Sequence, residues 1–297
     1  MKQKVIVTGA AGFVGRNLVP QLLKRGFRVT ALVKNDQEKA HLANTKVKVE
    51  VIDLAKTGEW PKFLDPDSIV IHLAAEISSK NPQTFVRNNV VATRNLISFA
   101  KKVKIQRIIH FSSAAVTSIR LDDYAKTKKK QEELIIKSEI PYLVLRPSMM
   151  YGPTDDKNIG WLIKMAKSLP VIPLPGGGNF GRQPVYIGDV CEIVIAMISQ
   201  KTNNKIYEVH GYEYVTLKEM IKEINKQFRI KKLALPVPII FLKAAIAVQQ
   251  RVLRNPKFTT DQIESLTSGE KFKGDDWAKL FGIIPTNFSK GLGKMKV

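Results

Sequence analysis

Short apolar runs alternate with stretches of helical periodicity along the first part of the chain. Runs rich in β-branched residues predict buried strands at residues 4–8, 27–33, 47–54, 68–75, 106–113 and 142–147. Apolar residues recur at helical spacing from Phe13 to about Arg25, from about Thr84 to Lys102 and around Tyr124. Gly26 lies where the first helix would end with a glycine cap. The alternation predicts an α/β fold, a doubly wound parallel sheet with helices on both faces.

The pattern changes after Pro147, which fixes the preceding residue as extended and ends the last of these strands. Two Pro- and Gly-rich stretches, 151–158 and 169–181, predict loops. Residues 184–199 then predict a strand and a helix, residues 205–211 another strand, and the tail from about Val215 a mostly helical segment. We therefore expect one domain from residues 1–147 with about 184–210, and a smaller lobe from residues 148–183 and 211–297.

The chain of 297 residues has a formal net charge of +22. Its lysines are scattered, and the sequence lacks zinc-finger, RRM and basic-arm signatures, so specific nucleic-acid binding is not expected. A basic surface suited to anionic ligands is the favoured interpretation. The apolar stretch Leu233–Val248 is interrupted by Pro236, Pro238 and Lys243, which makes it too short to span a membrane. An apolar surface element that meets a membrane is the lesser alternative.

Cys191 is the only cysteine, so no intrachain disulfide can form and a reducing, cytoplasmic location is expected. A strand begins almost at the N-terminus, which predicts no signal peptide. Cys191 is expected to be a packed apolar residue. His72 and His110 fall in or beside predicted buried strands and are interpreted as core residues. The sequence shows no metal-ligand spacing, and we expect no metal site.

A glycine-rich turn with Gly9, Gly12 and Gly15 joins the first predicted strand to the first predicted helix. Glycines permit the tight turn and a close backbone approach, and the helix N-terminus then faces a pyrophosphate. Together with Ala11 and Phe13, this turn predicts the cofactor loop of a Rossmann dinucleotide-binding domain.

The end of the second strand bears on the choice of cofactor. An NAD enzyme usually has an acidic residue there for the ribose hydroxyls, whereas this chain has Lys34 first and Asp36 only later. Because a cation suits a 2′-phosphate, we expect NADP, with NAD as the alternative.

The sequence contains two Tyr-x-x-x-Lys patterns, Tyr124/Lys128 and Tyr214/Lys218. Lysine is so frequent that a match alone is weak evidence. Tyr124/Lys128 follows the fifth strand and has Ser113 upstream, whereas Tyr214/Lys218 lies in the tail without such partners. We interpret the second pair as a surface feature.

The glycine spacing, with "IDL", "HLAA", "FSSAAV", "YAKTK" and "LRPSMMYGP", resembles the extended short-chain dehydrogenase/reductase superfamily, and within it the NAD-dependent epimerase/dehydratase group. The resemblance covers about residues 1–210 and, more loosely, the tail. It implies catalytic roles for Ser113, Tyr124 and Lys128, the last two also touching the cofactor. It implies further cofactor contacts at Asp53, Leu54, Leu73, Ala74, Ala75, Asn89, Pro147 and Ser148.

The Tyr124/Lys128 spacing also has a physical logic, because residues four apart share one face of a helix. A tyrosine hydroxyl has a pKa of about 10, far above neutrality. One lysine charge at about 4 Å contributes about 4 kcal/mol at an effective dielectric near 20, enough to bring that pKa to about 7. We therefore expect Lys128 to lower the pKa of Tyr124. Ser113 would hold the substrate oxygen while Tyr124 transfers a proton.

Several residues depart from the pattern that this resemblance implies. Ala114 and Ala115 replace the acidic pair of sugar dehydratases, which argues against dehydration. Met149 stands where many nucleotide-sugar enzymes have an asparagine, and Arg182 is a candidate for gripping an anionic part of the substrate. Met149, Arg182 and Ser113 are therefore our candidate substrate-binding residues.

"RPS" and "QPVYIGDV" also resemble the branch that contains the dehydrogenase-like accessory subunit of respiratory complex I. Two functions remain open. One is an NAD(P)-dependent oxidoreductase or epimerase acting on a small molecule, with nucleotide sugars among the candidates, and with a homodimer as one assembly. The alternative is a dinucleotide-binding accessory protein of a larger, membrane-associated complex without turnover.

Overall fold

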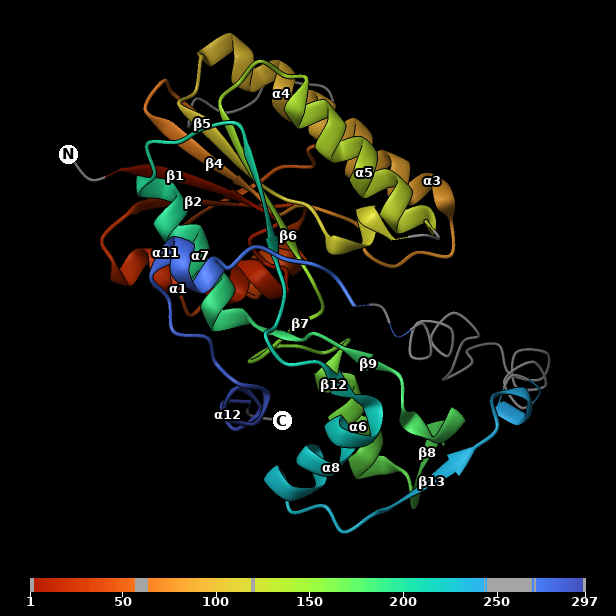
Figure 1. Cartoon of the computed structure of the whole chain (residues 1–297). Coiled ribbons are helices and arrows are strands. Elements are labelled where there is room, and N and C mark those ends of the chain that lie inside the picture. Colours follow the sequence, from red (N-terminus) through yellow and green to blue (C-terminus); the bar gives the residue numbers. More distant parts are fainter. Residues whose placement is uncertain are drawn as a thin grey trace. The chain divides into compact units, whose positions relative to one another are not determined.

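The computed structural model describes residues 3–56, 64–118, 121–242, 244, 269 and 271–295. Its contacts group the chain into two compact units, drawn in Figure 1. The first unit comprises Met1–Ser148, Ile187–Val209 and Gly274–Ile284, and the second comprises Met149–Tyr186, His210–Lys273 and Pro285–Val297. The segment Gly274–Ile284 thus belongs with the first unit, although the sequence pattern had grouped it with the C-terminal lobe.

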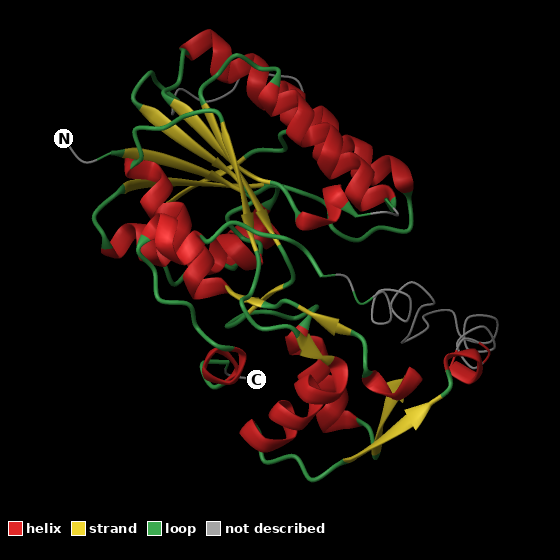
Figure 2. Cartoon of the chain, viewed as in Figure 1, coloured by secondary structure: helices red, strands yellow, loops and turns green. Residues whose placement is uncertain are grey.

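A seven-stranded parallel sheet forms the centre of the first unit (Figure 2). Its strands are β1 (Lys4–Thr8), β2 (Arg28–Val33), β3 (Lys48–Val51), β4 (Ser68–His72), β5 (Arg107–Phe111), β6 (Tyr142–Pro147) and β11 (Lys205–Val209). They lie in the order β11-β6-β5-β4-β1-β2-β3, and every neighbouring pair is parallel. The predicted doubly wound α/β fold is confirmed. The order reverses between β1 and β4, where doubly wound sheets bind ligands at the carboxyl ends of the strands.

Helices cover both faces of this sheet. They are α1 (Phe13–Lys24), α2 (Asp36–Ala40), α3 (Pro82–Phe85), α4 (Ala92–Val103), α5 (Asp123–Ile136), α7 (Ile187–Ser199) and α11 (Trp277–Phe281). Figure 1 shows α3, α4 and α5 on one face and α1, α7 and α11 on the other. The glycine cap of α1 is confirmed. Gly26 has a φ of 80°, and the amides of Gly26 and Phe27 donate to the carbonyls of Leu23 and Leu22.

The single helix predicted over about 84–102 is formed from three segments. A π-helical segment, η1 (Val86–Val91), lies between α3 and α4 without a break in the chain's helical course. A π-helical insertion adds a residue to the local turn, and such insertions occur frequently at functional sites. Apolar periodicity cannot reveal it, because the flanking helices keep their own spacing.

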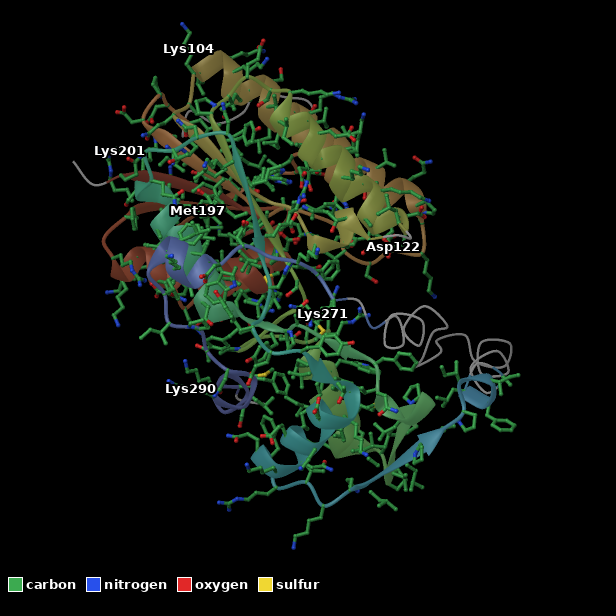
Figure 3. All side chains as sticks on the ribbon, viewed as in Figure 1. Lys104, Asp122, Met197, Lys201, Lys271 and Lys290 are labelled. Carbon is green, nitrogen blue, oxygen red and sulfur yellow. The ribbon has the colours of Figure 1, made fainter. Side chains whose placement is uncertain are left out.

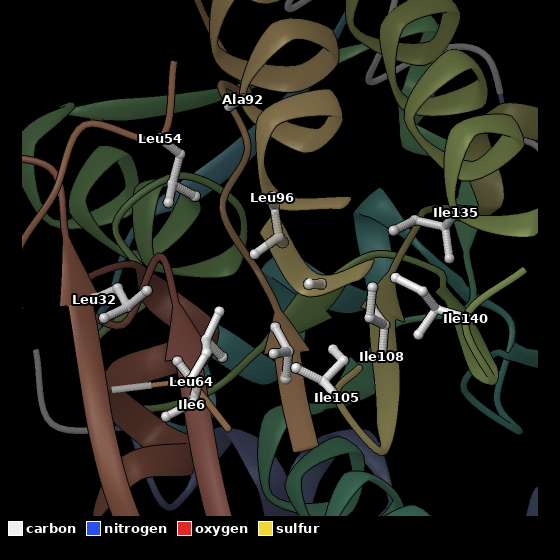
Figure 4. Packing of buried hydrophobic residues seen from close by; sticks show 12 residues of the cluster. Ile6, Leu32, Leu54, Leu64, Ala92, Leu96, Ile105, Ile108, Ile135 and Ile140 are labelled. Carbon is white, nitrogen blue, oxygen red and sulfur yellow. The ribbon is translucent and has the colours of Figure 1, made fainter. Parts of the chain in front are cut away.

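The core of the first unit lies between the sheet and the α4/α5 layer (Figure 4). Ile6, Val70 and Ile108 from the strands meet Leu96 of α4 and Ile135 of α5, and all five side chains are fully buried. Each such side chain stabilises the fold by about 1.5–3 kcal/mol relative to an exposed one. This core holds the carboxyl ends of β1, β4 and β5 beside α5, which carries the candidate catalytic residues.

The second unit is built from three two-stranded sheets and short helices. The sheets pair β7 (Met150–Tyr151) with β10 (Val185–Tyr186), β9 (Gly181–Arg182) with β12 (Val215–Thr216), and β8 (Val171–Pro175) with β13 (Leu233–Val237). The helices are α6 (Ile159–Ser168), α8 (Leu217–Gln227) and α12 (Phe288–Leu292), with a 3-10 turn, η3 (Gly176–Gly178).

One prediction for this unit is wrong, because a stretch predicted as loop contains β8. The tail predicted as mostly helical contains β13 besides its helices, and its residues 243, 245–268 and 270 lie outside the described residues. Both strands contain prolines, which weaken any sequence-based strand assignment but are tolerated where a strand has a free edge. Each belongs to a two-stranded sheet and therefore has such an edge.

Basic side chains lie on the outside of the structure. Figure 3 labels Lys104, Lys201 and Lys290, all of which are exposed. In the described part of the chain, no helix is both long and apolar enough to cross a membrane. Of the apolar stretch Leu233–Val248, Leu233–Val237 is β13, while 243 and 245–248 lie outside the described residues. Cys191 is buried in α7, and burial raises the pKa of its thiol to about 12.

Candidate active site

The glycine turn lies between the end of β1 and the start of α1. Gly9 has a φ of 63°, and a Cβ there would lie 2.8 Å from the backbone of Ala74. At Gly15 a Cβ would lie 2.3 Å from the carbonyl oxygen of Ala10. Packing within the protein therefore requires glycine at both positions.

Gly12 differs from these two glycines. It is exposed, its φ is −72°, and a Cβ there would meet only the carbonyl oxygen of Gly9, at 3.2 Å. It is the N-cap of α1, where no side chain caps the helix and the first turn holds no acidic residue. The backbone amides of this helix end therefore face outward at a position suited to an anion. Phe13 begins α1, and Ala11 is buried inside the turn. The residues of this loop fit a dinucleotide pyrophosphate.

The ends of β1 and β4 are tied together beside this turn. The Leu73 amide donates to the Thr8 carbonyl at 3.3 Å, and the Ala74 amide donates to the Thr8 hydroxyl at 3.2 Å. Leu73, Ala74 and Ala75 are all partly exposed. They follow β4 at the reversal of strand order, the position at which the sequence predicted cofactor contacts.

A second cluster of predicted cofactor residues lies at the ends of β2 and β3. Asp53 forms an ion pair with Arg87 at 2.5 Å and accepts the Ala55 amide at 3.1 Å. Burial opposes ionisation of Asp53, but these bonds and the charges of Arg87 and Lys34 outweigh it, so the Asp53 pKa is lowered. Lys34 is exposed, and its Nζ donates to the side-chain oxygen of Asn88 at 3.4 Å.

Two other residues that the sequence pointed to here have simpler surroundings. Leu54 is buried in the hydrophobic core of the first unit. Asp36 begins α2 and is exposed. Arg87 was not predicted from the sequence. Its position in the π-helical segment η1 gives no signal of the pairing with Asp53.

The π-helical segment positions Asn89, which is fully buried. Its side-chain oxygen accepts the Glu76 amide at 2.6 Å, and its side-chain nitrogen donates to the Glu76 carbonyl and to the Thr127 hydroxyl. Asn89 therefore holds the loop after β4 against the first turns of α5.

Ser113 and Tyr124, to which the family resemblance assigned catalytic roles, lie close together. Ser113 follows β5 and accepts the Ala115 amide at 3.2 Å as the cap of the short 3-10 turn η2 (Ala114–Thr117). Tyr124 lies in the first turn of α5, which begins where the Asp122 carboxylate accepts the Ala125 amide. The Ser113 side chain lies near enough to Tyr124 to have a lowering effect on the pKa of its hydroxyl.

The expectation that Lys128 lowers the pKa of Tyr124 is wrong for this structure. Burial raises the Tyr124 pKa above its usual value, the Asp122 carboxylate raises it further, and only the nearby Ser113 side chain opposes this. The physical reason is the orientation of the Lys128 side chain, whose ammonium group is held by other acceptors. Lys128 Nζ donates to the carbonyl of Phe111, at 2.6 Å, and to the side-chain oxygen of Gln131.

Lys128 is itself strongly perturbed. Burial lowers the pKa of its ammonium to about 7, and the Glu132 carboxylate only partly offsets this. The neutral amine has two N–H groups, which match its two acceptors, Phe111 and Gln131. Lys128 can therefore gain or lose its third proton near neutral pH while keeping both hydrogen bonds.

Gln131 connects Lys128 to a buried polar network that the sequence did not reveal. Its side-chain nitrogen donates to the Thr93 hydroxyl at 2.8 Å and to the Ala74 carbonyl at 3.1 Å, and lies 3.0 Å from His72 Nε2. His72 Nε2 is also 2.9 Å from the Thr93 hydroxyl, and His72 Nδ1 is 2.8 Å from the Thr8 hydroxyl. The network runs from α5 to the ends of β4 and β1.

His72 is buried as expected, but it is a hydrogen-bonded member of this network rather than a passive core residue. Burial, followed by the charge of Lys128, lowers its pKa to about 3, so its ring is neutral at physiological pH. His110 stacks near it, with ring centroids 5.4 Å apart. Burial is also the main cause that holds the pKa of His110 well below its usual value. A sequence signal did exist, since Thr8 and His72 are polar residues that end mainly apolar strands.

A buried ion-pair cluster anchors α5 to the sheet. Arg146, in β6, forms hydrogen-bonded ion pairs with Glu132 of α5 and, at 2.7 Å, with Glu208 of β11. Mainly because of the bond to Glu132, the pKa of the Arg146 guanidinium is raised. This cluster lies one turn beyond Lys128 and keeps that end of α5 in place.

The remaining predicted residues are divided between the units. Pro147 ends β6, paired with Val209, and the Ser148 amide donates to the Val209 carbonyl at 2.9 Å. Met149 and Arg182 belong to the second unit. Met149 accepts the Val185 amide at 2.9 Å, and Arg182 is part of β9. Their roles toward substrate stay predictions.

Tyr214 and Lys218 do not share a helix. Tyr214 precedes β12, whereas Lys218 lies in α8, and both are exposed. The Tyr214 hydroxyl accepts the Gly181 amide at 3.1 Å and donates to the Gly269 carbonyl at 3.2 Å, so it supports local structure. Among the described residues, no group of three or more His, Cys, Asp or Glu side chains could hold a metal ion.

Residues 5–209 match the model of the NAD dependent epimerase/dehydratase family. The chain is 31% identical over 170 residues to a ceramide reductase of Caulobacter vibrioides, a match that covers 57% of this chain and 53% of that protein. It is 26% identical over 268 residues to a UDP-glucose 4-epimerase of Vibrio cholerae, covering 80% of each chain.

Two further similarities cover more of the chain. NADH dehydrogenase [ubiquinone] 1 alpha subcomplex subunit 9 of Dictyostelium discoideum is 26% identical over 268 residues, covering 87% of this chain and 74% of that protein. Among solved structures, the UDP-glucuronic acid 4-epimerase of Bacillus cereus in complex with NAD has a TM-score of 0.74 at 23% identity. It covers 98% of this chain and 97% of the other. At this identity the likeness shows a shared fold.

Proposed function

This chain belongs to the NAD dependent epimerase/dehydratase family. We propose that it is an oxidoreductase or epimerase that transfers hydride to or from a hydroxyl or ketone group of a small substrate, with Ser113, Tyr124 and Lys128 as its catalytic residues. The observation that carries the proposal is the proximity of Ser113 to Tyr124, which has a lowering effect on the Tyr124 pKa, one helical turn before Lys128. These groups lie beside the ends of β4 and β5, next to a glycine turn whose exposed amides suit a pyrophosphate.

Each residue has a role that follows from its surroundings. When bound, the nicotinamide accepts or supplies the hydride. The Ser113 oxygen already accepts an amide, so its O–H is left to donate, either to Tyr124 or to the substrate oxygen. Because the pKa of Tyr124 is raised, its hydroxyl is protonated at neutral pH and is ready to donate to a ketone oxygen. Lys128, with its pKa of about 7, can then supply a compensating positive charge nearby.

We propose NADP as the preferred cofactor, with NAD also accepted. Lys34 presents an exposed ammonium directly after β2, where a ribose 2′-phosphate would lie. The acidic residue nearest in sequence, Asp36, begins a separate helix, while Asp53 is already paired with Arg87. The Glu38 carboxylate accepts the Lys34 backbone amide at 2.8 Å, so the Lys34 ammonium is the exposed cation directly after β2.

The second unit is proposed to supply substrate contacts through Met149 and Arg182. Two substrate classes follow from the names of the relatives above, nucleotide sugars and ceramide-like lipids. The test is a screen of both classes with NADPH and NADH, followed by nicotinamide absorbance, with Tyr124→Phe as the matched inactive control. Turnover by wild type that is lost in Tyr124→Phe supports the proposal. Turnover that persists in the variant would contradict the catalytic assignment.

A dinucleotide-binding accessory role is the second candidate. It is favoured by the similarity to the complex I subunit over most of the chain. Tight cofactor binding without turnover of any substrate class, together with co-purification in a large complex, would favour this role over the enzyme.

Two further proposals concern the protein's setting. A single cysteine, buried in α7, suits a reducing compartment, and we propose a cytoplasmic location that a fractionation experiment can check. We also propose a homodimer, which sedimentation velocity of the full chain tests directly.

A further inference from the structure

The second unit carries exposed apolar side chains that its own core does not use. They are Val171 of β8, Leu233 and Leu235 of β13, and Ile240 and Phe241 just beyond it. Leu233 is 63% exposed, Ile240 73% and Phe241 66%. We call these five residues the apolar rim. Scattered single exposed apolar residues are ordinary, but a group on paired strands and the turn that follows them is a sign of an interaction surface.

Strand register places part of the apolar rim on one face. Leu233 pairs with Val171 in the parallel β8/β13 sheet, so their side chains point the same way. Leu235 points with them, because side chains two residues apart share a face of a strand.

The chain then turns sharply after β13. The amide of Phe241 donates to the Pro238 carbonyl at 3.1 Å and begins a helical turn (Figure 1, beyond β13). Ile239 turns inward, since a Cβ on Gly176 would lie 3.4 Å from its Cδ1. Ile240 and Phe241 are left outside.

The chain around the apolar rim carries only positive charge. Residues 224–260 contain no aspartate or glutamate and eight basic residues, namely Lys226, Arg229, Lys231, Lys232, Lys243, Arg251, Arg254 and Lys257. Of those within the described residues, Lys226, Arg229 and Lys231 are exposed. The rim is thus flanked on its N-terminal side by exposed cations.

We infer that the apolar rim and its flanking cations dock on the surface of an anionic lipid bilayer, with Ile240 and Phe241 entering the boundary between headgroups and acyl chains. A bilayer surface matches both features at once, because acidic headgroups pair with the cations while the layer beneath accepts apolar side chains. Nucleic acid or an acidic peptide would match the cations alone. The inference does not depend on the proposed catalytic function.

The magnitudes favour reversible attachment. Each basic residue near an anionic surface strengthens binding by about fivefold, and each buried apolar side chain adds to this. Several such contacts suffice for binding that salt and single substitutions can measurably weaken.

The test is co-sedimentation of the full-length protein with vesicles of phosphatidylcholine containing about a quarter phosphatidylglycerol, compared with vesicles of phosphatidylcholine alone. We expect binding to the anionic vesicles that falls by more than about tenfold in the double variant Ile240→Ser/Phe241→Ser. The matched control is Ile284→Ser, at a position 90% exposed in the first unit, which should bind like wild type.

A charge variant separates specific docking from general attraction to a basic protein. Lys226→Gln/Lys231→Gln should weaken binding more than Lys104→Gln/Lys201→Gln, which removes two exposed lysines of the first unit. Circular dichroism and cofactor affinity verify that each variant is folded.

Two outcomes would overturn the inference. One is no binding to anionic vesicles, and if the double variant Ile240→Ser/Phe241→Ser then dissociates a dimer, the apolar rim is assigned to self-association. The other is binding that this double variant leaves unchanged, which means adsorption by net charge alone.

Discussion

The side-chain oxygen of Gln131 accepts a hydrogen bond from Lys128 Nζ, three residues earlier on α5. Lysine has only donors, so the amide oxygen must face it, and the amide nitrogen then faces the Thr93 hydroxyl and the Ala74 carbonyl. The orientation of Gln131 is therefore fixed from both sides. Through it, the position of Lys128 depends on β4 and α4 as well as on its own helix.

Two substitutions of Gln131 should shift the pKa of Lys128 in opposite directions. Gln131→Leu removes one of two acceptors while burial persists, so the pKa of Lys128 should fall below about 7. Gln131→Glu adds a negative charge beside Nζ and should raise that pKa. The pH dependence of kcat/KM and of cofactor affinity measures both shifts. Gln83→Leu, at an exposed position on α3, is the control. Parallel shifts in both Gln131 variants would mean that the residue acts only through packing.

Removing the Tyr124 hydroxyl should separate catalysis from binding. Tyr124→Phe deletes the proton donor but leaves the glycine turn and the Lys128 network intact. Cofactor affinity should stay within a few-fold, while turnover should fall by about 10²–10⁴-fold. Tyr214→Phe should leave turnover unchanged, although it loses the hydrogen bonds to Gly181 and Gly269 and some stability with them. Equal activity of Tyr124→Phe and wild type would remove Tyr124 from the mechanism.

Substitutions at Gly12 and Gly15 of the glycine turn should impair the protein for different reasons. Gly12→Val should fold, because only the Gly9 carbonyl lies near, but its side chain would occupy the space of the pyrophosphate and abolish cofactor binding. Gly15→Ala should unfold at lower temperature, since its Cβ would lie 2.3 Å from the Ala10 carbonyl oxygen. Thermal melts and calorimetric titration with cofactor distinguish the two. Wild-type affinity in a folded Gly12→Val protein would rule out this placement of the pyrophosphate.

Burial of Lys128 should make the stability of the fold depend on pH. Its folded-state pKa of about 7 lies below its unfolded value of 10.5, so the unfolded chain binds more protons between these values. This group therefore destabilises the fold most below pH 7, and stability recovers as pH rises from about 7 to 10.5. The total effect is up to about 5 kcal/mol.

Lys128→Met should abolish that recovery. Urea unfolding across this pH range should give a difference between wild type and variant that grows with pH in favour of wild type. Lys129→Met, at the exposed neighbouring position, is the control. A difference that stays constant with pH would mean that the lysine is protonated in the folded protein throughout.

Lys34 should select the cofactor. Lys34→Glu places a carboxylate where a 2′-phosphate would lie and should weaken NADP binding far more than NAD binding. The local backbone should be preserved, because the contact of this residue with Glu38 runs through its amide nitrogen. Lys39→Glu, exposed on α2, controls for general charge. Tighter binding of NAD than of NADP by the wild type would refute the preference.

Much of the first unit was predictable because its signals are local. Strand runs with β-branched residues, the glycine turn between β1 and α1, and the cap at Gly26 depend on residues a few positions apart. The spacing of Tyr124 and Lys128 follows from one helical turn. In the second unit the same signals were weaker, because β8 and β13 contain prolines and are stabilised by pairing with each other across about sixty residues.

The amino-acid sequence by itself determined the order of elements in the first unit and the fold class, and it predicted the positions at which we expect a cofactor and a proton donor. Tertiary structure alone decided how these groups interact. Gln131, Thr93, His72 and Thr8 come from α5, α4, β4 and β1, and no local pattern shows that they meet. The pKa of Lys128 and that of Tyr124 depend on desolvation, which is set by every segment that covers a side chain. Helical spacing placed tyrosine and lysine on one face, but the fold turned the lysine toward Phe111 and Gln131.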